Sequence, residues 1–303
     1  MIYYMSPGTP ETLSGGTRKL YDHVAILQNN GFDAKIIGTH DPRNGFHSGD
    51  LVVVPEVYGE EILKFNPGVP RIGFCQNGYL VDRWGIPDKA RHPYETCPDV
   101  KAVMVDSEHT AEILRNKYPR CAEIIVTHSS GNGRSGRLGP FWFAPWPRPK
   151  RIVYFQYKHE HLNPQIFNEL PLPQGWWTEC MTGKSDEEIA ELYRQSSIFV
   201  AANFEEGLCA PTQEAMISGT YIVGWYGGGT EEYLKGRSLM VEQDNIADLR
   251  AAIVTVAEAM DKYPLAYESA CADWSRWHQR YYSRQREIEE ICGIMERFHG
   301  RNK

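Results

Sequence analysis

The stretch NFEEGLCAPTQEAMISGTYIVGWYGGGTEEYL, residues 203–234, decides the fold of this chain. An apolar run at 197–202 precedes it and predicts a buried strand, and 220–225 predicts a second one. Between them, 212–218 predicts a short helix that ends at Gly219. Three glycines at 227–229 then lead to another predicted helix start. Strands and helices alternating in this way are typical of a parallel α/β sheet.

Two carboxylates, Glu206 and Glu214, lie on either side of the predicted helix start at Pro211. Proline suits the first helical position because its missing N–H would be unpaired there anyway. Ala210 is a poor N-cap, so we expect the helix to begin with amide donors that lack a partner in the chain. Open α/β sheets bind ligands at such helix starts, beyond the carboxyl ends of their strands. A loop of solvated glutamates is the alternative interpretation of either residue alone.

The whole pattern resembles the donor-binding block of the retaining family 4 glycosyltransferases, which have the GT-B fold. The shared residues are Glu206, Glu214, Ala215, Met216, Gly219, Thr220, Val223, Gly228, Gly229 and Glu232. The resemblance implies that Glu206 contacts the donor sugar and that Glu214 binds the ribose hydroxyls. The donor loop between them consists of Gly207, Leu208, Cys209 and Ala210, and its last three residues replace the more usual aromatic-Gly-Leu.

The first half of the chain also alternates between predicted strands and helices, which indicates a parallel sheet with crossover connections. The expected strands are 1–5, 34–37, 51–54, 71–75, 101–105 and 123–126. By the resemblance, 1–140 is an acceptor lobe, 141–265 is a donor-binding lobe, and helices within 266–303 are candidates for crossing back to the first lobe.

Several residues after these strands are candidate site residues. The pair Gly15-Gly16 fits the family's loop that faces the donor diphosphate, although a simple turn into a helix explains it equally well. Gln76 and Asn77 stand where many relatives carry a histidine, and amides can bind a sugar hydroxyl but cannot act as a base near neutral pH. His109 is a separate candidate for acceptor or sugar contact, with a structural role at a helix start as the alternative.

The second half begins with expected strands at 151–156 and 176–180. The family places an arginine and a lysine after the first of them, where they neutralise the diphosphate. Their usual spacing is missing here, so Lys158 is the candidate for that charge, and a solvated loop lysine is the alternative. Gly183 lies in the turn where the resemblance places the nucleotide base.

The linker at 127–150 mixes basic and aromatic side chains, a composition that can bind single-stranded nucleic acid or a membrane interface. We favour aromatic packing between lobes, because the 303-residue chain has 32 basic against 39 acidic side chains and a net charge of −7. The four arginines at 276, 280, 284 and 286 are expected to form a solvated face of the last helices.

Seven scattered cysteines indicate reduced thiols in a cytoplasmic protein. The sequence shows no signal peptide, no transmembrane stretch and no metal-ligand motif, so we expect neither a metal ion nor another cofactor. The hydrophobic content of 42% is that of a packed globular protein.

The sequence therefore predicts an α/β protein with two Rossmann-like lobes facing across a cleft. The resemblance implies a metal-independent retaining transferase that moves a glycosyl unit from a nucleoside diphosphate sugar to a hydroxyl acceptor, which is a saccharide, a lipid-linked compound or another molecule. A nucleotide-sugar binding protein, an epimerase or phosphorylase on the same fold, and a glycosyltransferase acting on nucleic acid remain as alternatives.

Overall fold

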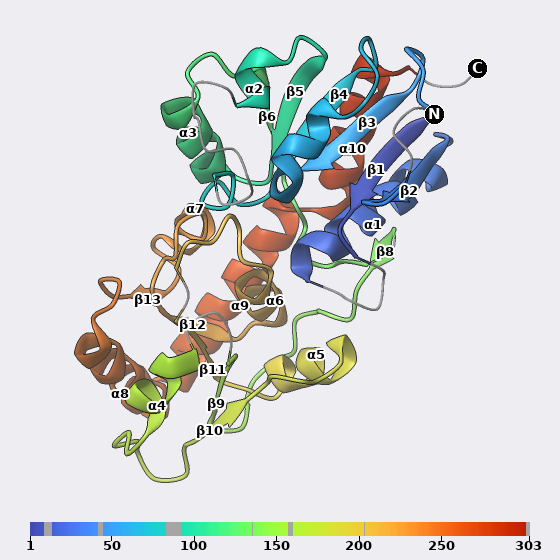
Figure 1. Cartoon of the computed structure of the whole chain (residues 1–303). Coiled ribbons are helices and arrows are strands. Elements are labelled where there is room, and N and C mark those ends of the chain that lie inside the picture. Colours follow the sequence, from blue (N-terminus) through green and yellow to red (C-terminus); the bar gives the residue numbers. More distant parts are fainter. Residues whose placement is uncertain are drawn as a thin grey trace. The chain divides into compact units, whose positions relative to one another are not determined.

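The computed structural model describes residues 1–8, 14–41, 45–82, 92–134, 136–156, 160–202 and 204–300. The chain divides into two compact units, each built on a parallel sheet (Figure 1). Unit 1 comprises Met1–Gly139 with Ser283–Lys303, and unit 2 comprises Pro140–Tyr282. Two parallel-sheet α/β units confirm the predicted fold class.

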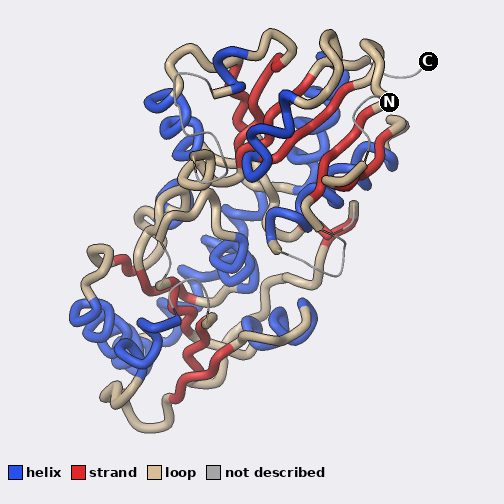
Figure 2. Tube along the Cα trace, viewed as in Figure 1, coloured by secondary structure: helices blue, strands red, loops and turns tan. Residues whose placement is uncertain are grey.

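Unit 1 contains a six-stranded sheet in the order β2-β1-β3-β4-β5-β6. Figure 2 shows its strands in red and the helices in blue. Its strands are β1 (Ile2–Ser6), β2 (Ala34–Gly38), β3 (Leu51–Pro55), β4 (Arg71–Cys75), β5 (Val100–Val105) and β6 (Glu123–Val126). All their pairings are parallel, and every strand expected from the sequence is present. A short hairpin of β7 (Gly133–Arg134) and β8 (Arg137–Leu138) lies within the segment that the sequence predicted to be a linker.

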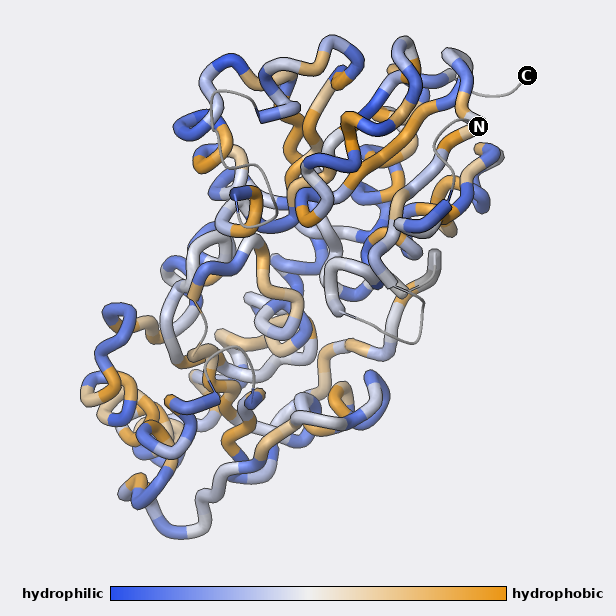
Figure 3. Tube along the Cα trace, in the orientation of Figure 1, coloured by the Kyte–Doolittle hydropathy of each residue, from blue (hydrophilic) through white to orange (hydrophobic). Residues whose placement is uncertain are grey.

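Helices cover both faces of this sheet, and its central strands β3 and β4 are buried along their whole length. Figure 3 shows hydrophobic residues, in orange, along the strands of this sheet. In β3, Val53 belongs to one core cluster, while its neighbours Val52 and Val54 belong to the other. The helices are α1 (Gly15–Asn29), η1 (Glu56–Leu63), α2 (Pro93–Thr96), α3 (Glu108–Lys117) and α10 (Arg284–Phe298). Helices α1 and α10 share the first cluster and α3 the second.

Unit 2 contains a five-stranded parallel sheet in the order β10-β9-β11-β12-β13. Its strands are β9 (Arg151–Tyr154), β10 (Trp177–Cys180), β11 (Ile198–Ala201), β12 (Tyr221–Gly224) and β13 (Leu239–Met240). The helices are η3 (Glu160–Leu162), α4 (Asn163–Phe167), α5 (Asp186–Arg194), α6 (Ala210–Ser218), α7 (Glu231–Leu234), α8 (Ile246–Lys262) and α9 (Pro264–Tyr281). Of the helices in the C-terminal segment, α9 clusters with unit 2 and α10 with unit 1. None of the helices in the described ranges is long and apolar enough to cross a bilayer.

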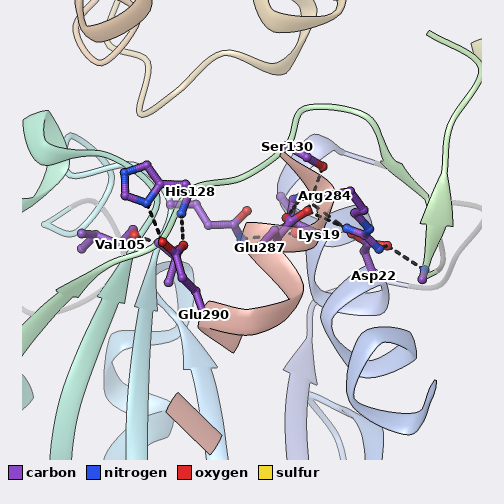
Figure 4. A network of polar contacts seen from close by, with 12 residues as sticks. Lys19, Asp22, Val105, His128, Ser130, Arg284, Glu287 and Glu290 are labelled. Atoms are coloured by element: carbon purple, nitrogen blue, oxygen red, sulfur yellow. Dashed lines mark hydrogen bonds and ion pairs between the residues drawn. The ribbon is translucent and has the colours of Figure 1, made fainter. Parts of the chain in front are cut away.

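A buried ionic cluster joins α10 to α1 within unit 1 (Figure 4). Arg284 binds both oxygens of Asp22, at 2.6 and 2.7 Å, and also reaches Glu287 at 2.6 Å. Lys19 of α1 reaches the other oxygen of Glu287 at 2.6 Å. The side chain of Arg284 is 10% exposed, so the prediction that it belongs to a solvated face is wrong. Its partner Asp22 lies 262 residues away, so helical spacing in the C-terminal segment could not reveal it.

A second buried arginine, Arg148, lies at the start of unit 2 and is 8% exposed. Its guanidinium donates to the carbonyl groups of Tyr193 and Ser196 at 3.0 and 3.1 Å, and to the Thr220 hydroxyl at 3.2 Å. It also donates to the carbonyl groups of Ala144 and Ser218. Arg148 therefore holds the end of α6 inside unit 2. Because it is buried, Arg148 does not belong to a basic surface of the basic-aromatic segment at 127–150.

Candidate functional site

The loops at the carboxyl edge of the unit 2 sheet carry most of the residues that the sequence singled out. The strand order reverses between β9 and β11, and open α/β sheets bind ligands at such a switch point. The loop after β11 contains Glu206 and Gly207, and the loop after β9 contains Lys158. Residues 157–159 lie outside the described residues, so the structure gives no contact for Lys158.

The backbone of Glu206 is fixed to the glycine loop that follows β12. The Glu206 N–H donates to the Gly227 carbonyl at 2.8 Å, and the Gly229 N–H donates to the Glu206 carbonyl at 3.2 Å. Gly227 and Gly228 have φ values of 68° and 101°, a conformation that side chains with a Cβ disfavour. The two loops that the sequence connected by motif alone are thus joined by hydrogen bonds.

Helix α6 begins one residue earlier than predicted, at Ala210, and its N-cap is Cys209. The side chain of Cys209 does not cap the helix amides, so the expectation of a helix start without a side-chain cap holds at the shifted position. Cys209 adopts φ 57° and ψ 82°, in the left-handed region. Leu208 and Cys209 are buried, and Glu214, in the second turn of α6, is 6% exposed.

Gly183 lies in the turn between β10 and α5, where its φ is 80° and the space around its Cα is open. The Gln156 N–H donates to the Thr182 hydroxyl at 2.9 Å, which connects this turn to the segment that follows β9. Gly183 therefore belongs to the same edge of the sheet as Glu206.

In unit 1 the structure brings two predicted residues into direct contact. The side-chain amide of Gln76, just after β4, donates to the Gly16 carbonyl in the first turn of α1 at 3.2 Å. A Cβ on Gly16 would lie 3.2 Å from the same amide nitrogen, a tight distance, whereas Gly15 has open space around it. The strand order reverses between β1 and β3, so the Gly15-Gly16 loop also follows a strand at a switch point.

Asn77 and His109 are connected through Tyr79, a residue that the sequence analysis did not single out. The Asn77 side-chain oxygen accepts from the Tyr79 N–H at 3.0 Å, and the Tyr79 hydroxyl lies 2.7 Å from His109 Nε2. His109 is half-buried in the first turn of α3, whose N-cap is Ser107. The sequence gives only a weak signal for Tyr79, because its contact with His109 is seen only in the folded structure.

Glu56 is a second residue that sequence reasoning missed. It follows β3 directly and is 4% exposed. Burial raises the pKa of Glu56 from its usual 4.5 to about 7, while hydrogen bonds from the backbone N–H groups of Glu56, Gln76 and Asn77 lower it in part. One oxygen of its carboxyl group has no hydrogen-bond partner within the described part of the chain. The Glu56 carboxyl group thus accepts from the Gln76 and Asn77 backbone, and an acidic residue directly after a buried strand was the available signal.

The described residues contain no group of three or more histidine, cysteine, aspartate or glutamate side chains placed to hold a metal ion. The arrangement in unit 2 offers two carboxylates, backbone amides at a helix start and flexible glycines. Such groups can bind hydroxyls and phosphates. The arrangement in unit 1 offers amides, a hydroxyl and an imidazole, which suit hydroxyl recognition.

Two parallel-sheet α/β units of this kind define the GT-B glycosyltransferase fold, and solved structures show it. Sucrose-phosphate synthase from Thermosynechococcus elongatus is similar with a TM-score of 0.69 and 12% identity over 98% of both chains. HepE of Anabaena, solved with UDP and glucose, is similar with a TM-score of 0.64 and 8% identity, over 98% of this chain and 99% of that one. At these identities the likeness establishes the fold alone.

The pneumococcal O-GlcNAc transferase GtfA, solved with UDP and GlcNAc, has a TM-score of 0.61 and 12% identity over 84% of this chain. This chain spans 57% of the length of GtfA. Residues 178–259 match the family described as glycosyl transferases group 1, and this segment contains both glutamates, the donor loop and the glycine loop. No curated protein matches the sequence significantly.

Proposed function

We propose that this protein is a retaining glycosyltransferase that moves a glycosyl unit from a nucleoside diphosphate sugar to a hydroxyl acceptor. One observation carries the proposal: Glu206 and Glu214 lie on either side of the start of α6, at the switch point of a parallel sheet, inside the segment that matches group 1 glycosyltransferases. Glu206 positions the donor sugar and Glu214 binds the ribose hydroxyls. Neither role depends on the charge of a metal ion.

The reaction breaks the bond between the anomeric carbon and the diphosphate oxygen, and it forms a bond from that carbon to the acceptor oxygen. The departing phosphate oxygen takes the acceptor proton, so no side chain has to act as a base. Positive charge and N–H donors stabilise the leaving diphosphate. The amides of Gly207 to Ala210 and of Gly15-Gly16 are the proposed donors, and Gly183 lies beside the nucleotide base.

Lys158 is the proposed cation for the diphosphate, because its loop and the Glu206 loop follow the two strands that flank the switch point. Lys158→Ala is expected to weaken diphosphate binding by about 1.5–3 kcal/mol, the range for hydrogen bonds to charged groups. Binding of the bare nucleoside is expected to stay unchanged, because it lacks the diphosphate. Calorimetry with the nucleoside diphosphate that the parent binds, and with its nucleoside, tests this, and equal diphosphate affinity in parent and variant removes Lys158 from the site.

Gln76, Asn77 and His109 are the proposed acceptor or sugar contacts, since unit 1 gathers them at the edge of its sheet through Gly16 and Tyr79. A nucleic-acid acceptor is not proposed, because Arg148 of the basic-aromatic segment is buried and engaged by carbonyl groups. The proposed reaction requires neither a metal ion nor another cofactor.

The direct test is a donor screen by thermal shift followed by a transfer assay. A bound donor raises the melting temperature by linkage. A shift with one nucleoside diphosphate sugar, followed by release of its diphosphate when an acceptor is added, is the expected result. Loss of transfer in EDTA with recovery in Mg²⁺ would contradict the metal-independent mechanism, and no shift with any nucleotide sugar would contradict the proposal as a whole.

A further inference from the structure

The donor loop has a backbone conformation that its sequence does not favour. Cys209 adopts φ 57° and ψ 82°, a region that glycine tolerates and that residues with a Cβ rarely adopt. Glu205, four residues earlier, also has a positive φ of 59°. Such a conformation persists only where the surrounding structure holds it. The loop therefore depends on a restraint from outside its own sequence.

Tyr233 of α7 supplies that restraint. Its hydroxyl lies 2.8 Å from the Leu208 carbonyl oxygen and 3.2 Å from the Cys209 carbonyl oxygen, and it donates to them. The Tyr233 side chain is fully buried. A hydroxyl at such a position needs a partner, because an unpaired buried polar group is strongly unfavourable. The two carbonyl groups on either side of the strained residue accept its hydrogen bond.

The contact between Tyr233 and the donor loop belongs to a larger network of buried polar groups. The Thr212 side chain hydrogen-bonds to the Tyr233 hydroxyl, and the Cys209 thiol lies 3.1 Å from the Thr212 hydroxyl. Burial raises the pKa of Tyr233 well above its usual value, so its hydroxyl keeps the proton that it donates to the loop. These hydrogen bonds form a closed ring, since they begin at the side chain of Cys209 and end at the backbone of the same residue.

Resting on the glycosyltransferase function proposed above, we propose that Tyr233 is a positioning residue for the donor loop. Its hydroxyl holds the Leu208 and Cys209 carbonyl groups, and so keeps Cys209 in the left-handed conformation that sets the path from Glu206 into α6. A glycine at 209 would reach that conformation without help. Tyr233 therefore stabilises a left-handed conformation at position 209 that a glycine would adopt through its own flexibility.

Tyr233→Phe tests the inference because it removes the hydroxyl and leaves the ring. Tyr193→Phe is the matched control: Tyr193 is also fully buried, and its hydroxyl donates to the Pro211 carbonyl at 2.8 Å, within α6 rather than at the strained peptide. Amide hydrogen exchange of residues 205–213 is the readout, and it needs no ligand. We expect exchange about tenfold faster in Tyr233→Phe. We expect little change in Tyr193→Phe.

The double variant Tyr233→Phe with Cys209→Gly separates positioning from general stability. If the hydroxyl acts by holding Cys209, glycine at 209 restores slow exchange in the absence of the hydroxyl. Thr212→Val, which removes the hydroxyl between Cys209 and Tyr233, is expected to give a smaller increase. Unchanged exchange in Tyr233→Phe, an equal increase in Tyr193→Phe, or no rescue by Cys209→Gly would each overturn the inference.

Titration with UDP, GDP and ADP connects the inference to the proposed function. Whichever diphosphate the parent binds, Tyr233→Phe is expected to bind it about threefold to tenfold more weakly, and the double variant is expected to recover. Equal affinity in parent and Tyr233→Phe, with exchange altered, would overturn the donor-positioning role. If the parent binds none of the three, nor CDP or dTDP, while exchange responds as expected, the proposed function fails and the role of Tyr233 in holding the loop stands.

Discussion

Two buried arginines secure the two helices on which the candidate site depends, and they do so by different means. In unit 1, Arg284 pairs with carboxylates of α1 and α10. In unit 2, Arg148 is surrounded by backbone carbonyl groups and one hydroxyl at the ends of α5 and α6. Helix α1 begins with Gly15-Gly16, and α6 carries Glu214.

The surroundings shift the pKa values of the two guanidinium groups in opposite directions. Burial lowers the pKa of Arg148 to about 10. Burial alone lowers the pKa of Arg284 as well, but Asp22 and Glu287 outweigh it and the net shift is upward. Both side chains stay charged at neutral pH. A buried charge can therefore be accommodated either by opposite charges or by oriented carbonyl dipoles, and the two solutions respond differently to mutation and pH.

Removal of Arg284 has the largest expected effect on stability. Arg284→Ala leaves Asp22 and Glu287 buried with Lys19 as their remaining cation, and breaking a buried pair in this way costs about 3–5 kcal/mol. Urea unfolding measures the loss. Arg276→Ala is the matched control, because its pair with Asp273 is solvent-exposed and is worth at most about 1 kcal/mol. Similar losses in both variants would contradict the ionic-cluster interpretation.

Removal of Arg148 is expected to destabilise the protein somewhat less, by about 2–4 kcal/mol, because carbonyl groups rather than charges lose their partner. Substitution by lysine distinguishes the two surroundings. Arg284→Lys keeps a positive charge for the carboxylates. Arg148→Lys instead loses the guanidinium N–H groups that donate to five acceptors. We therefore expect lysine to recover more stability at 284 than at 148, and the reverse order in urea unfolding would refute the distinction.

The two regions also differ in their response to acid. Burial alone raises the pKa of Glu287, but the charges of Lys19 and Arg284 outweigh it and lower the pKa from 4.5 to about 2. A depressed carboxyl pKa stabilises the fold fully above pH 4.5, and this contribution disappears as the pH falls toward 2. At most about 3 kcal/mol is at stake. Glu287→Gln is expected to flatten the stability curve between pH 4.5 and 2, while Arg148→Ala leaves its slope unchanged.

The sequence predicted those parts of the molecule that depend on local pattern. The apolar run at 51–54 predicted the strand β3, and Pro211 predicted the helix start between Glu206 and Glu214. The ionic cluster depends on Asp22 and Arg284, which are far apart in the chain. The proposed role of Tyr233 depends on the positive φ of Cys209, which cannot be read from the identity of the residue.

Glu206 and Glu214 have different proposed roles at the donor, and calorimetry with the diphosphate that the parent binds, beside single-turnover transfer, separates them. Glu214→Ala is expected to weaken diphosphate binding by about 1.5–3 kcal/mol. Glu206→Ala is expected to keep diphosphate affinity and to slow transfer about a hundredfold, because a contact that orients the sugar is lost. Equal loss of diphosphate affinity in both variants would contradict the division of roles. Unchanged binding and transfer in both would contradict the site itself.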